Sequence, residues 1–81
     1  MKTFHLTIAR VGEALFDGEA VSALIPGAEG TFQVLAGHEP LVSELKAGEI
    51  KVKTPDDRTQ TFPISTSGLA EVSGNQATVL L

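Results

Sequence analysis

The sequence predicts an all-β fold, a sandwich or barrel built from eight to ten short strands. Three observations support this prediction. Apolar residues alternate with polar ones in several segments, which is the period-two pattern of strands with one buried face. Glycine, proline, asparagine and aspartate recur at short, regular intervals, as turns between strands require. The segment that could begin a helix, residues 13–15, lies between Gly12 and Gly18, which leave room for barely one turn.

In the amino-terminal half, strands are expected where apolar residues alternate or cluster between turn signals. Asp17-Gly18 is a dipeptide typical of turns, so the chain should reverse there. Pro26-Gly27 should end the strand that precedes it, and Pro40 favours an extended backbone at Glu39 in the loop before the next strand. The strands expected in this half cover residues 4–9, 20–25, 31–35 and 41–45.

In the carboxy-terminal half, two hairpins are expected. The run Thr54-Pro55-Asp56-Asp57 fits a type I turn, with proline at its second position. Pro63 cannot donate a ladder hydrogen bond, so its strand should lie at a sheet edge or contain a bulge. Gly74-Asn75 stands where a two-residue hairpin turn belongs. The strands expected in this half cover residues 49–54, 59–64, 69–72 and 77–81.

Composition and charge narrow the function classes. The 81 residues allow one domain at most, covering residues 1–81, and the lack of cysteine excludes disulfides, zinc–thiolate sites and thiol nucleophiles. The net charge is −4, and no basic cluster exists beyond Lys51 and Lys53, which disfavours nucleic-acid binding. No apolar run approaches the ~20 residues needed to span a bilayer. We therefore expect no direct membrane insertion, and membrane association only through a partner.

The residues that could carry chemistry do not form a catalytic set. His5 lies opposite the apolar face of the first strand, which favours a solvent-facing or cross-strand role. His38 has neither an orienting carboxylate nor further metal ligands, so a structural or interface role is expected. The segment Gly27-Ala28-Glu29-Gly30 lacks the Lys-Ser/Thr pair and the following helix of a phosphate loop. We expect no catalytic residue, no metal site and no cofactor, and hence a binding or structural protein.

An ordered set of short motifs covers almost the whole chain. The set resembles the amino-terminal sandwich domain of the epsilon subunit of the F-type ATP synthase. Each motif is weak alone, and the resemblance rests on their order and spacing. The chain departs from the common pattern at Ala36 and Ala47, where many family members have proline. The motifs are Phe4-His5-Leu6, Phe16-Asp17-Gly18, Gly27-Ala28-Glu29-Gly30, Gly37-His38-Glu39-Pro40-Leu41, Leu45-Lys46-Ala47-Gly48, Gly68-Leu69-Ala70-Glu71-Val72 and Asn75-Gln76-Ala77-Thr78-Val79-Leu80.

The resemblance implies both a fold and a role. The fold would be a flattened β-sandwich of about ten short, mostly antiparallel strands. The role would be that of a non-catalytic rotor subunit in the central stalk, which links the gamma subunit to the membrane c ring and helps couple ion translocation to ATP synthesis. The residues implied at the c ring are Glu29, Gly30, Thr31 and Phe32. The residues implied at the gamma subunit are His38, Pro40, Leu41 and Val42.

The resemblance also implies a location and a ligand expectation. The domain would lie at the cytoplasmic face of the bacterial inner membrane, or the equivalent face of an organelle membrane, as a peripheral part of a membrane complex. Family members usually continue into a carboxy-terminal helical hairpin that can inhibit ATP hydrolysis and in some binds ATP. Because this sequence does not encode the hairpin, we expect no nucleotide binding.

Two other function classes remain to be weighed. A generic β-sandwich module that binds carbohydrate or peptide would need exposed aromatic side chains, and the sequence contains neither tryptophan nor tyrosine. A small enzyme would need a nucleophile and a base in reach of each other, which the motifs do not supply. A rotor subunit instead predicts an interface patch, with some of Phe32, Val34 and Leu35 exposed in the isolated domain.

Overall fold

The structure is a computed structural model that describes residues 2–65 and 67–81. Over these ranges the chain forms nine strands and no helix, so it contains no helix that could cross a membrane. The expectation of an all-β fold is therefore confirmed. The strands are β1 (Phe4–Arg10), β2 (Glu13–Ala20), β3 (Ser22–Gly27), β4 (Gly30–Leu35), β5 (Leu41–Leu45), β6 (Gly48–Lys53), β7 (Thr59–Ile64), β8 (Gly68–Ser73) and β9 (Gln76–Leu80).

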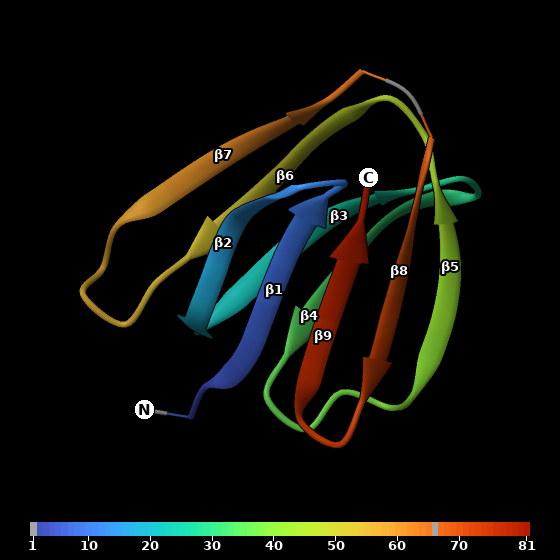
Figure 1. Cartoon of the computed structure of the whole chain (residues 1–81). Coiled ribbons are helices and arrows are strands. Elements are labelled where there is room, and N and C mark those ends of the chain that lie inside the picture. Colours follow the sequence, from blue (N-terminus) through green and yellow to red (C-terminus); the bar gives the residue numbers. More distant parts are fainter. Residues whose placement is uncertain (1, 66) are drawn as a thin grey trace.

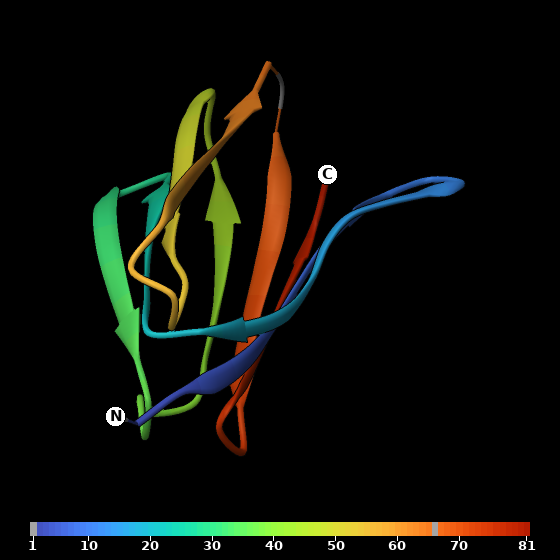
Figure 2. The same cartoon turned by 90° about the vertical axis from the view of Figure 1, so that its left-hand side faces the viewer.

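The strands form one continuous sheet that curls on itself. Their order is β2-β1-β9-β8-β5-β3-β6-β7, and β4 pairs with β3 outside this path. Neighbouring strands are antiparallel except β1 and β9, which run parallel from His5 opposite Gln76 to Ala9 opposite Leu80. Figures 1 and 2 show the resulting layers, with β8 and β9 facing the layer that holds β3, β4 and β6. The first and last strands thus lie side by side at the centre of one layer.

Strands β2 and β7, which stand at the two ends of this order, meet through side chains rather than backbone hydrogen bonds. The rings of Phe16 and Phe62 pack edge to face, with centroids 5.9 Å apart and an interplanar angle of 68°. At the corner between β2 and β3, the Val21 N–H donates to the carbonyl oxygen of Lys53 at 2.8 Å. These contacts close the curled sheet and leave a compact interior between the layers.

The interior is entirely apolar over the described residues, with no buried polar or charged side chain. It follows from the period-two pattern, because residues two apart on a strand point to the same face. A close-packed apolar interior of this kind deforms little. The buried side chains are Phe4, Leu6, Ile8, Ala20, Ala23, Ile25, Val34, Leu45, Ile50, Val52, Ile64, Ala70, Val72, Ala77 and Val79.

Two turn predictions are wrong. Asp17-Gly18 lies inside β2, opposite Thr7 and Leu6, because the Asp17 carboxylate bonds across the strand pair to His5 instead of forming a local turn. The chain reverses earlier, at Val11 and Gly12, where Gly12 has a φ of +77°.

Pro26-Gly27 does not end its strand either. β3 continues through both residues, with Pro26 opposite Thr31 and Gly27 opposite Gly30. β3 pairs with β5 only at Gly27, so the missing N–H of Pro26 interrupts no continuous ladder on that side. The Pro26 carbonyl oxygen accepts a hydrogen bond from the Lys46 N–H at 3.0 Å. The reversal falls at the next two residues, before β4 begins.

The remaining turns follow the predictions. In the turn after β6, the Asp57 N–H donates to the Thr54 carbonyl oxygen at 3.0 Å, the bond that closes a four-residue turn. Pro63 lies on β7, which is an edge strand as expected. Gly74 and Asn75 both have positive φ angles, +58° and +59°, which a type I′ hairpin turn requires.

Gly27 provides a direct test of this packing. A Cβ at Gly27 would lie 2.7 Å from the Gly30 carbonyl oxygen and 3.0 Å from the Phe32 ring, so Gly27→Ala must displace one of them. We expect a loss of about 1–3 kcal/mol in the free energy of unfolding, measured by urea denaturation.

Gly18 offers the matched control, because it is also a strand glycine. A Cβ there would meet nothing closer than the Phe16 ring at 3.9 Å, so Gly18→Ala should be neutral or stabilise by about 0.5–1 kcal/mol. Equal effects of the two substitutions would show that the close approach at Gly27 does not matter.

Candidate docking surface

The β3–β4 hairpin positions the four residues implied at the c ring. Ala28 and Glu29 form its two-residue turn, between Gly27 and Gly30. Gly30 has a φ of +141°, a conformation that side-chain-bearing residues rarely adopt. The Phe32 ring packs against the Gly27 backbone and is only partly buried by the core. The hairpin therefore presents a carboxylate, two small residues and an aromatic ring at its end.

Strand β5 is bonded to the end of this hairpin. The Ala28 N–H donates to the Glu44 carbonyl oxygen at 2.8 Å, and Gly27 pairs with Leu45. A hollow of about 540 Å³ lies between the two segments, and we call it the groove. The residues lining the groove are Ala28, Glu29, Gly30, Thr31, Phe32, Leu41, Val42, Ser43 and Glu44.

The groove unites residues that the resemblance implies at two different partners. All four c-ring residues line it, and so do Leu41 and Val42, which are implied at gamma. Its lining is mixed: Phe32 and Leu41 are half-buried, Val42 is 65% exposed, and Glu29 and Glu44 carry carboxylates. A shallow, mixed surface of this kind suits a protein segment better than a small molecule, for which deep apolar enclosure is typical.

His38 and Pro40 do not line the groove and lie in the loop over residues 36–40. The His38 N–H donates to the Leu35 carbonyl oxygen at 3.1 Å, and Gly37 takes a φ of +79° in this turn. His38 Nδ1 donates to the carbonyl oxygen of Glu39 at 2.6 Å, so the ring is fixed by its own loop. This geometry contains no carboxylate that orients the imidazole, as general-base chemistry would need.

Beyond the loop, the start of β5 separates the groove from a second hollow of about 410 Å³. Pro40, Leu41 and Val42 line this second hollow together with residues of β8. Leu41 and Val42 thus border both hollows, while Pro40 belongs to the second alone. Of the residues implied at gamma, Pro40, Leu41 and Val42 thus line adjoining hollows, whereas His38 lines neither of them.

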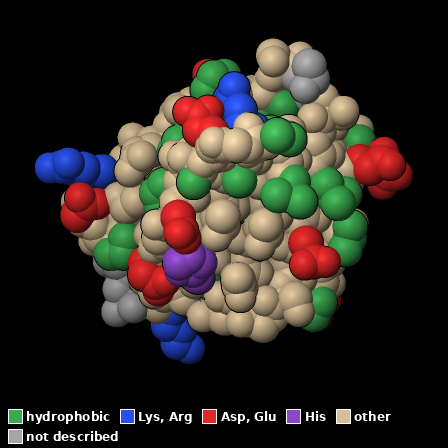
Figure 3. All heavy atoms as spheres, in the orientation of Figure 1, with side chains coloured by type: hydrophobic (Ala, Val, Ile, Leu, Met, Phe, Trp, Pro, Cys, Tyr) green, Lys and Arg blue, Asp and Glu red, His purple; other side chains and the backbone are tan. Residues whose placement is uncertain are grey.

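Exposed apolar side chains form a patch on the outer face of one layer. The strand registers place Ala9, Leu80 and Leu69 in one row across β1, β9 and β8. Leu80 is 53% exposed and Leu69 is 41% exposed. Figure 3 shows hydrophobic side chains gathered on this face, with the acidic and histidine side chains of the β1–β2 region to one side.

The expectation that some of Phe32, Val34 and Leu35 are exposed is confirmed by Leu35. Leu35 is 48% exposed, whereas Val34 is buried and Phe32 is half-buried. Val34 lies opposite Ala23 and points into the core, so the period of two places Leu35 on the outer face.

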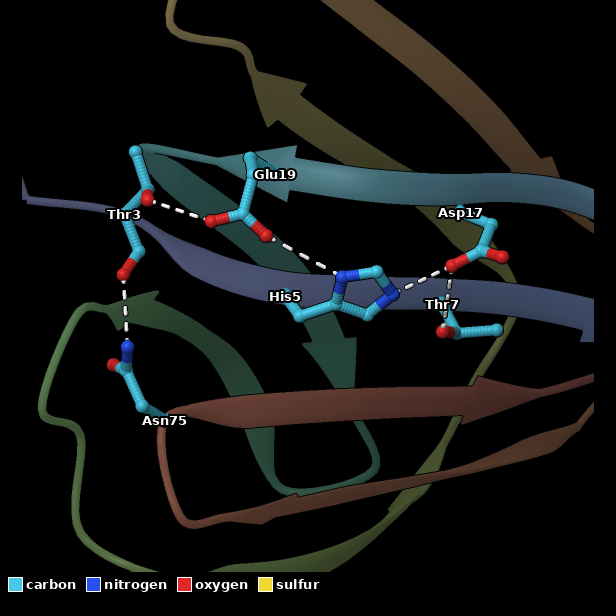
Figure 4. Close-up of polar contacts among 6 residues, drawn as sticks. All are labelled: Thr3, His5, Thr7, Asp17, Glu19 and Asn75. Carbon is cyan, nitrogen blue, oxygen red and sulfur yellow. Dashed lines mark hydrogen bonds and ion pairs between the residues drawn. The ribbon is translucent and has the colours of Figure 1, made fainter.

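A polar cluster occupies the outer face of β1 and β2 (Figure 4). His5 Nε2 lies 2.6 Å from Asp17 Oδ1, and His5 Nδ1 lies 3.3 Å from Glu19 Oε2. Thr3 Oγ1 donates to the second oxygen of Glu19 at 2.7 Å. The expected cross-strand role of His5 is confirmed. The hydrogen bond to Asp17, assisted by Glu19, outweighs the partial loss of hydration and raises the pKa of His5 above 6.5.

This cluster is not a metal site. Asp17 and Glu19 bind opposite nitrogens of the imidazole, as Figure 4 shows, so the three side chains do not converge on one point. No group of three histidine, aspartate or glutamate side chains in the described ranges could hold a metal ion.

Sequence reasoning missed several residues of this surface. The groove is also lined by Ala28, Ser43 and Glu44. These residues lie together because the Ala28 N–H bonds to the Glu44 carbonyl oxygen, a contact between segments that are separate in the sequence. The one available signal was the alternation of residues 41–45, which marks Ser43 as inward and Glu44 as outward. Asn75 was expected only as a turn residue, yet its side chain contacts the loop at Gly37.

Comparison with known proteins identifies a family. The family model described as the ATP synthase, Delta/Epsilon chain, beta-sandwich domain matches residues 3–81. The ATP synthase epsilon chain of Chlorobium limicola is 39% identical over 79 residues, which are 98% of this chain and 89% of that protein. The epsilon chain of Chlorobaculum tepidum is 43% identical over the same shares. The epsilon chain of a Bradyrhizobium species is 41% identical, and the match covers 58% of its length.

Solved structures share the fold. A chain of the Euglena gracilis mitochondrial ATP synthase, solved as OSCP/F1/c-ring in rotational state 1, matches with a TM-score of 0.89 and 26% identity. The match covers 96% of this chain and 49% of the Euglena chain, so this chain spans about half of it. A chain of the Tetrahymena thermophila mitochondrial ATP synthase central stalk/c-ring matches with a TM-score of 0.78, but its 12% identity supports the fold alone.

The polar cluster predicts how stability depends on pH. Because folding raises the pKa of His5, the protonated ring stabilises the fold fully below its unfolded value of 6.5. This contribution is lost as the pH rises through the higher folded value. The urea midpoint of the wild type should therefore exceed that of His5→Gln most at acidic pH, and the gap should shrink on going to alkaline pH.

Asp17→Asn supplies the control for this measurement, because it removes the carboxylate closest to the ring. In an Asp17→Asn background, the same comparison should show a weaker dependence on pH. A gap between wild type and His5→Gln that stays constant with pH would contradict the assignment.

Proposed function

This chain belongs to the ATP synthase delta/epsilon family through its β-sandwich domain, and we propose that it is a non-catalytic rotor subunit of the central stalk. In this role it links the gamma subunit to the ring of c subunits. Rotation of the ring, driven by ion translocation, is then coupled to ATP synthesis elsewhere in the complex. The observation that carries the proposal is the match to epsilon chains over nearly the whole sequence, at 39–43% identity for two relatives. The similarity to a chain solved with F1 and the c ring supports it further.

The architecture suits a subunit that transmits force. Its interior is apolar and close-packed over the described residues, and the curled sheet is closed by the Phe16–Phe62 contact. Such an interior resists deformation, so a load applied at one face reaches the other with little loss. The fold also keeps apolar side chains outside the core, at Val42, Leu69 and Leu80, where a partner can cover them.

The groove and its surroundings suggest how two partners are accommodated. We assign Glu29, Gly30, Thr31 and Phe32 to the contact with the c ring, and His38, Pro40, Leu41 and Val42 to the contact with gamma. Because Phe32 and Leu41 line the same groove, the two contacts would adjoin each other instead of lying on opposite faces. Gamma and the ring would then be held at a fixed distance by one rigid segment of the domain.

The location follows from these partners. With both contacts made to other subunits, the domain would be a peripheral part of the membrane complex. We place it at the cytoplasmic face of the bacterial inner membrane, or at the equivalent face of an organelle membrane. The whole of residues 1–81 would act as one docking unit.

Val42 tests the contact with gamma. Its side chain is 65% exposed on β5, so Val42→Asp should leave the fold intact while placing a charge among the residues assigned to gamma. We expect the affinity for purified gamma, measured by calorimetry, to fall by about tenfold or more, the usual cost of disrupting a buried interface anchor.

Val11→Asp is the matched control. Val11 is 99% exposed in the β1–β2 turn and belongs to neither proposed contact. Its substitution should change the affinity for gamma by less than about twofold. Equal losses in the two variants, or no binding of gamma by the wild type, would contradict the proposal.

A further inference from the structure

Asn75 contacts two separate parts of the chain, the loop at Gly37 and the amino-terminal segment at Thr3 and His5. It is the second residue of the β8–β9 turn, where its φ of +59° is tolerated by asparagine, aspartate and glycine better than by other residues. Its side-chain Oδ1 accepts a hydrogen bond from the Gly37 N–H at 2.9 Å, and its Nδ2 donates to the Thr3 carbonyl oxygen at 2.9 Å. Its own carbonyl oxygen accepts from the His5 N–H at 3.2 Å.

The side chain can satisfy these partners in one orientation only. The Gly37 amide can only donate and the Thr3 carbonyl can only accept, so the amide oxygen must face Gly37 and the nitrogen must face Thr3. Aspartate in its place could still accept from Gly37 but could not donate to Thr3. Glycine would keep the turn and lose both bonds.

The bond to Gly37 matters because the loop over residues 36–40 has few other attachments. Two further hydrogen bonds involve the loop, from the His38 N–H to Leu35 and from His38 Nδ1 to Glu39, and both are local. Within the described ranges, the bond from Gly37 to Asn75 is the hydrogen bond that joins this loop to a distant element. The bond lies directly beside His38 in the chain.

The other end of the Asn75 side chain is held as firmly. Thr3, which accepts its Nδ2 hydrogen bond, also donates through Oγ1 to Glu19 at 2.7 Å, and Glu19 contacts His5 (Figure 4). Asn75 is therefore anchored to the paired strands β1 and β2 while it holds the loop. Through these bonds, the position of Gly37 is fixed relative to strands β1 and β2.

We propose that Asn75 is a positioning residue, whose side-chain amide fixes the loop over residues 36–40 against the amino-terminal segment and so sets the geometry in which His38 and Pro40 meet the gamma subunit. The identity of the partner rests on the proposed function, whereas the hydrogen bonds of Asn75 are independent of it. Asn75 does not contact the partner and acts only through the loop.

The test compares Asn75→Gly with Asn75→Asp, both of which allow the positive φ of the turn. Native-state hydrogen exchange of the Gly37 amide is measured in the isolated chain, and affinity for purified gamma is measured by calorimetry. Asn75→Gly should speed Gly37 exchange and weaken gamma binding, each by about three- to tenfold, the scale of one lost hydrogen bond. Asn75→Asp keeps the acceptor for the Gly37 N–H and loses the donor to Thr3, so its Gly37 exchange and its affinity for gamma should fall between those of the wild type and Asn75→Gly.

Asp57→Gly controls for the loss of a polar side chain at a turn with positive φ. Asp57 has a φ of +65° in the β6–β7 turn, and its carboxylate contacts Lys53 instead of the loop. This variant should change neither Gly37 exchange nor gamma affinity. Its urea midpoint shows how much stability is lost when a polar turn residue is replaced by glycine without any effect on the loop.

Each result decides the proposal. Unchanged exchange at Gly37 in Asn75→Gly would show that the side chain does not hold the loop. Faster exchange with full gamma affinity would show that the loop position is irrelevant to docking, and the positioning role would be wrong. If the wild-type chain did not bind gamma, the proposed function would be wrong. The exchange rate of the Gly37 amide would still show whether the Asn75 side chain fixes the loop.

Discussion

The close approach of backbone and ring at Gly27 is the constraint on which the docking surface depends. Strand β3 pairs with β6 through Ser22, Ala23 and Leu24, and at Gly27 it pairs with β5 instead. Only a residue without a side chain allows the Gly30 carbonyl and the Phe32 ring to come so near. The hydrogen bond from the Ala28 N–H to the Glu44 carbonyl oxygen holds the end of this hairpin against β5, and the groove lies between the two segments.

A preformed groove has an energetic consequence for docking. A segment already held by backbone hydrogen bonds loses little conformational entropy when a partner binds, so more of the contact energy appears as affinity. The hairpin end is held by the bond from Ala28 to Glu44, and the neighbouring loop by the bond from Gly37 to Asn75. The apolar interior beneath them supplies the stiffness, while the side chains outside the core supply the contact. The molecule thus separates the residues that maintain shape from those available to partners.

The fold was largely accessible from the sequence because its strands follow local patterns. Two strands, Leu41–Leu45 and Thr59–Ile64, have the bounds that turn residues and alternation predict. The failures at Asp17-Gly18 and Pro26-Gly27 share a cause. In both places a residue type that favours a local turn is used for a long-range bond, to His5 and to Lys46. A single sequence contains no direct signal for such partners.

The candidate site was less accessible for the same reason. Motif resemblance supplied Glu29 to Phe32 and His38 to Val42, but not their arrangement around shared hollows. Glu44 lies beside the hairpin because its carbonyl oxygen accepts from the Ala28 N–H. Asn75 lies beside the amino-terminal segment because β9 pairs with β1. Both contacts join elements that are distant in the sequence. We propose that one rigid segment holds the two partners side by side. Photo-crosslinking from Thr31 and from Val42 in the assembled ATP synthase tests it most directly: Thr31 should link to a c subunit and Val42 to gamma, whereas links to neither partner, or to the same one, would contradict the account.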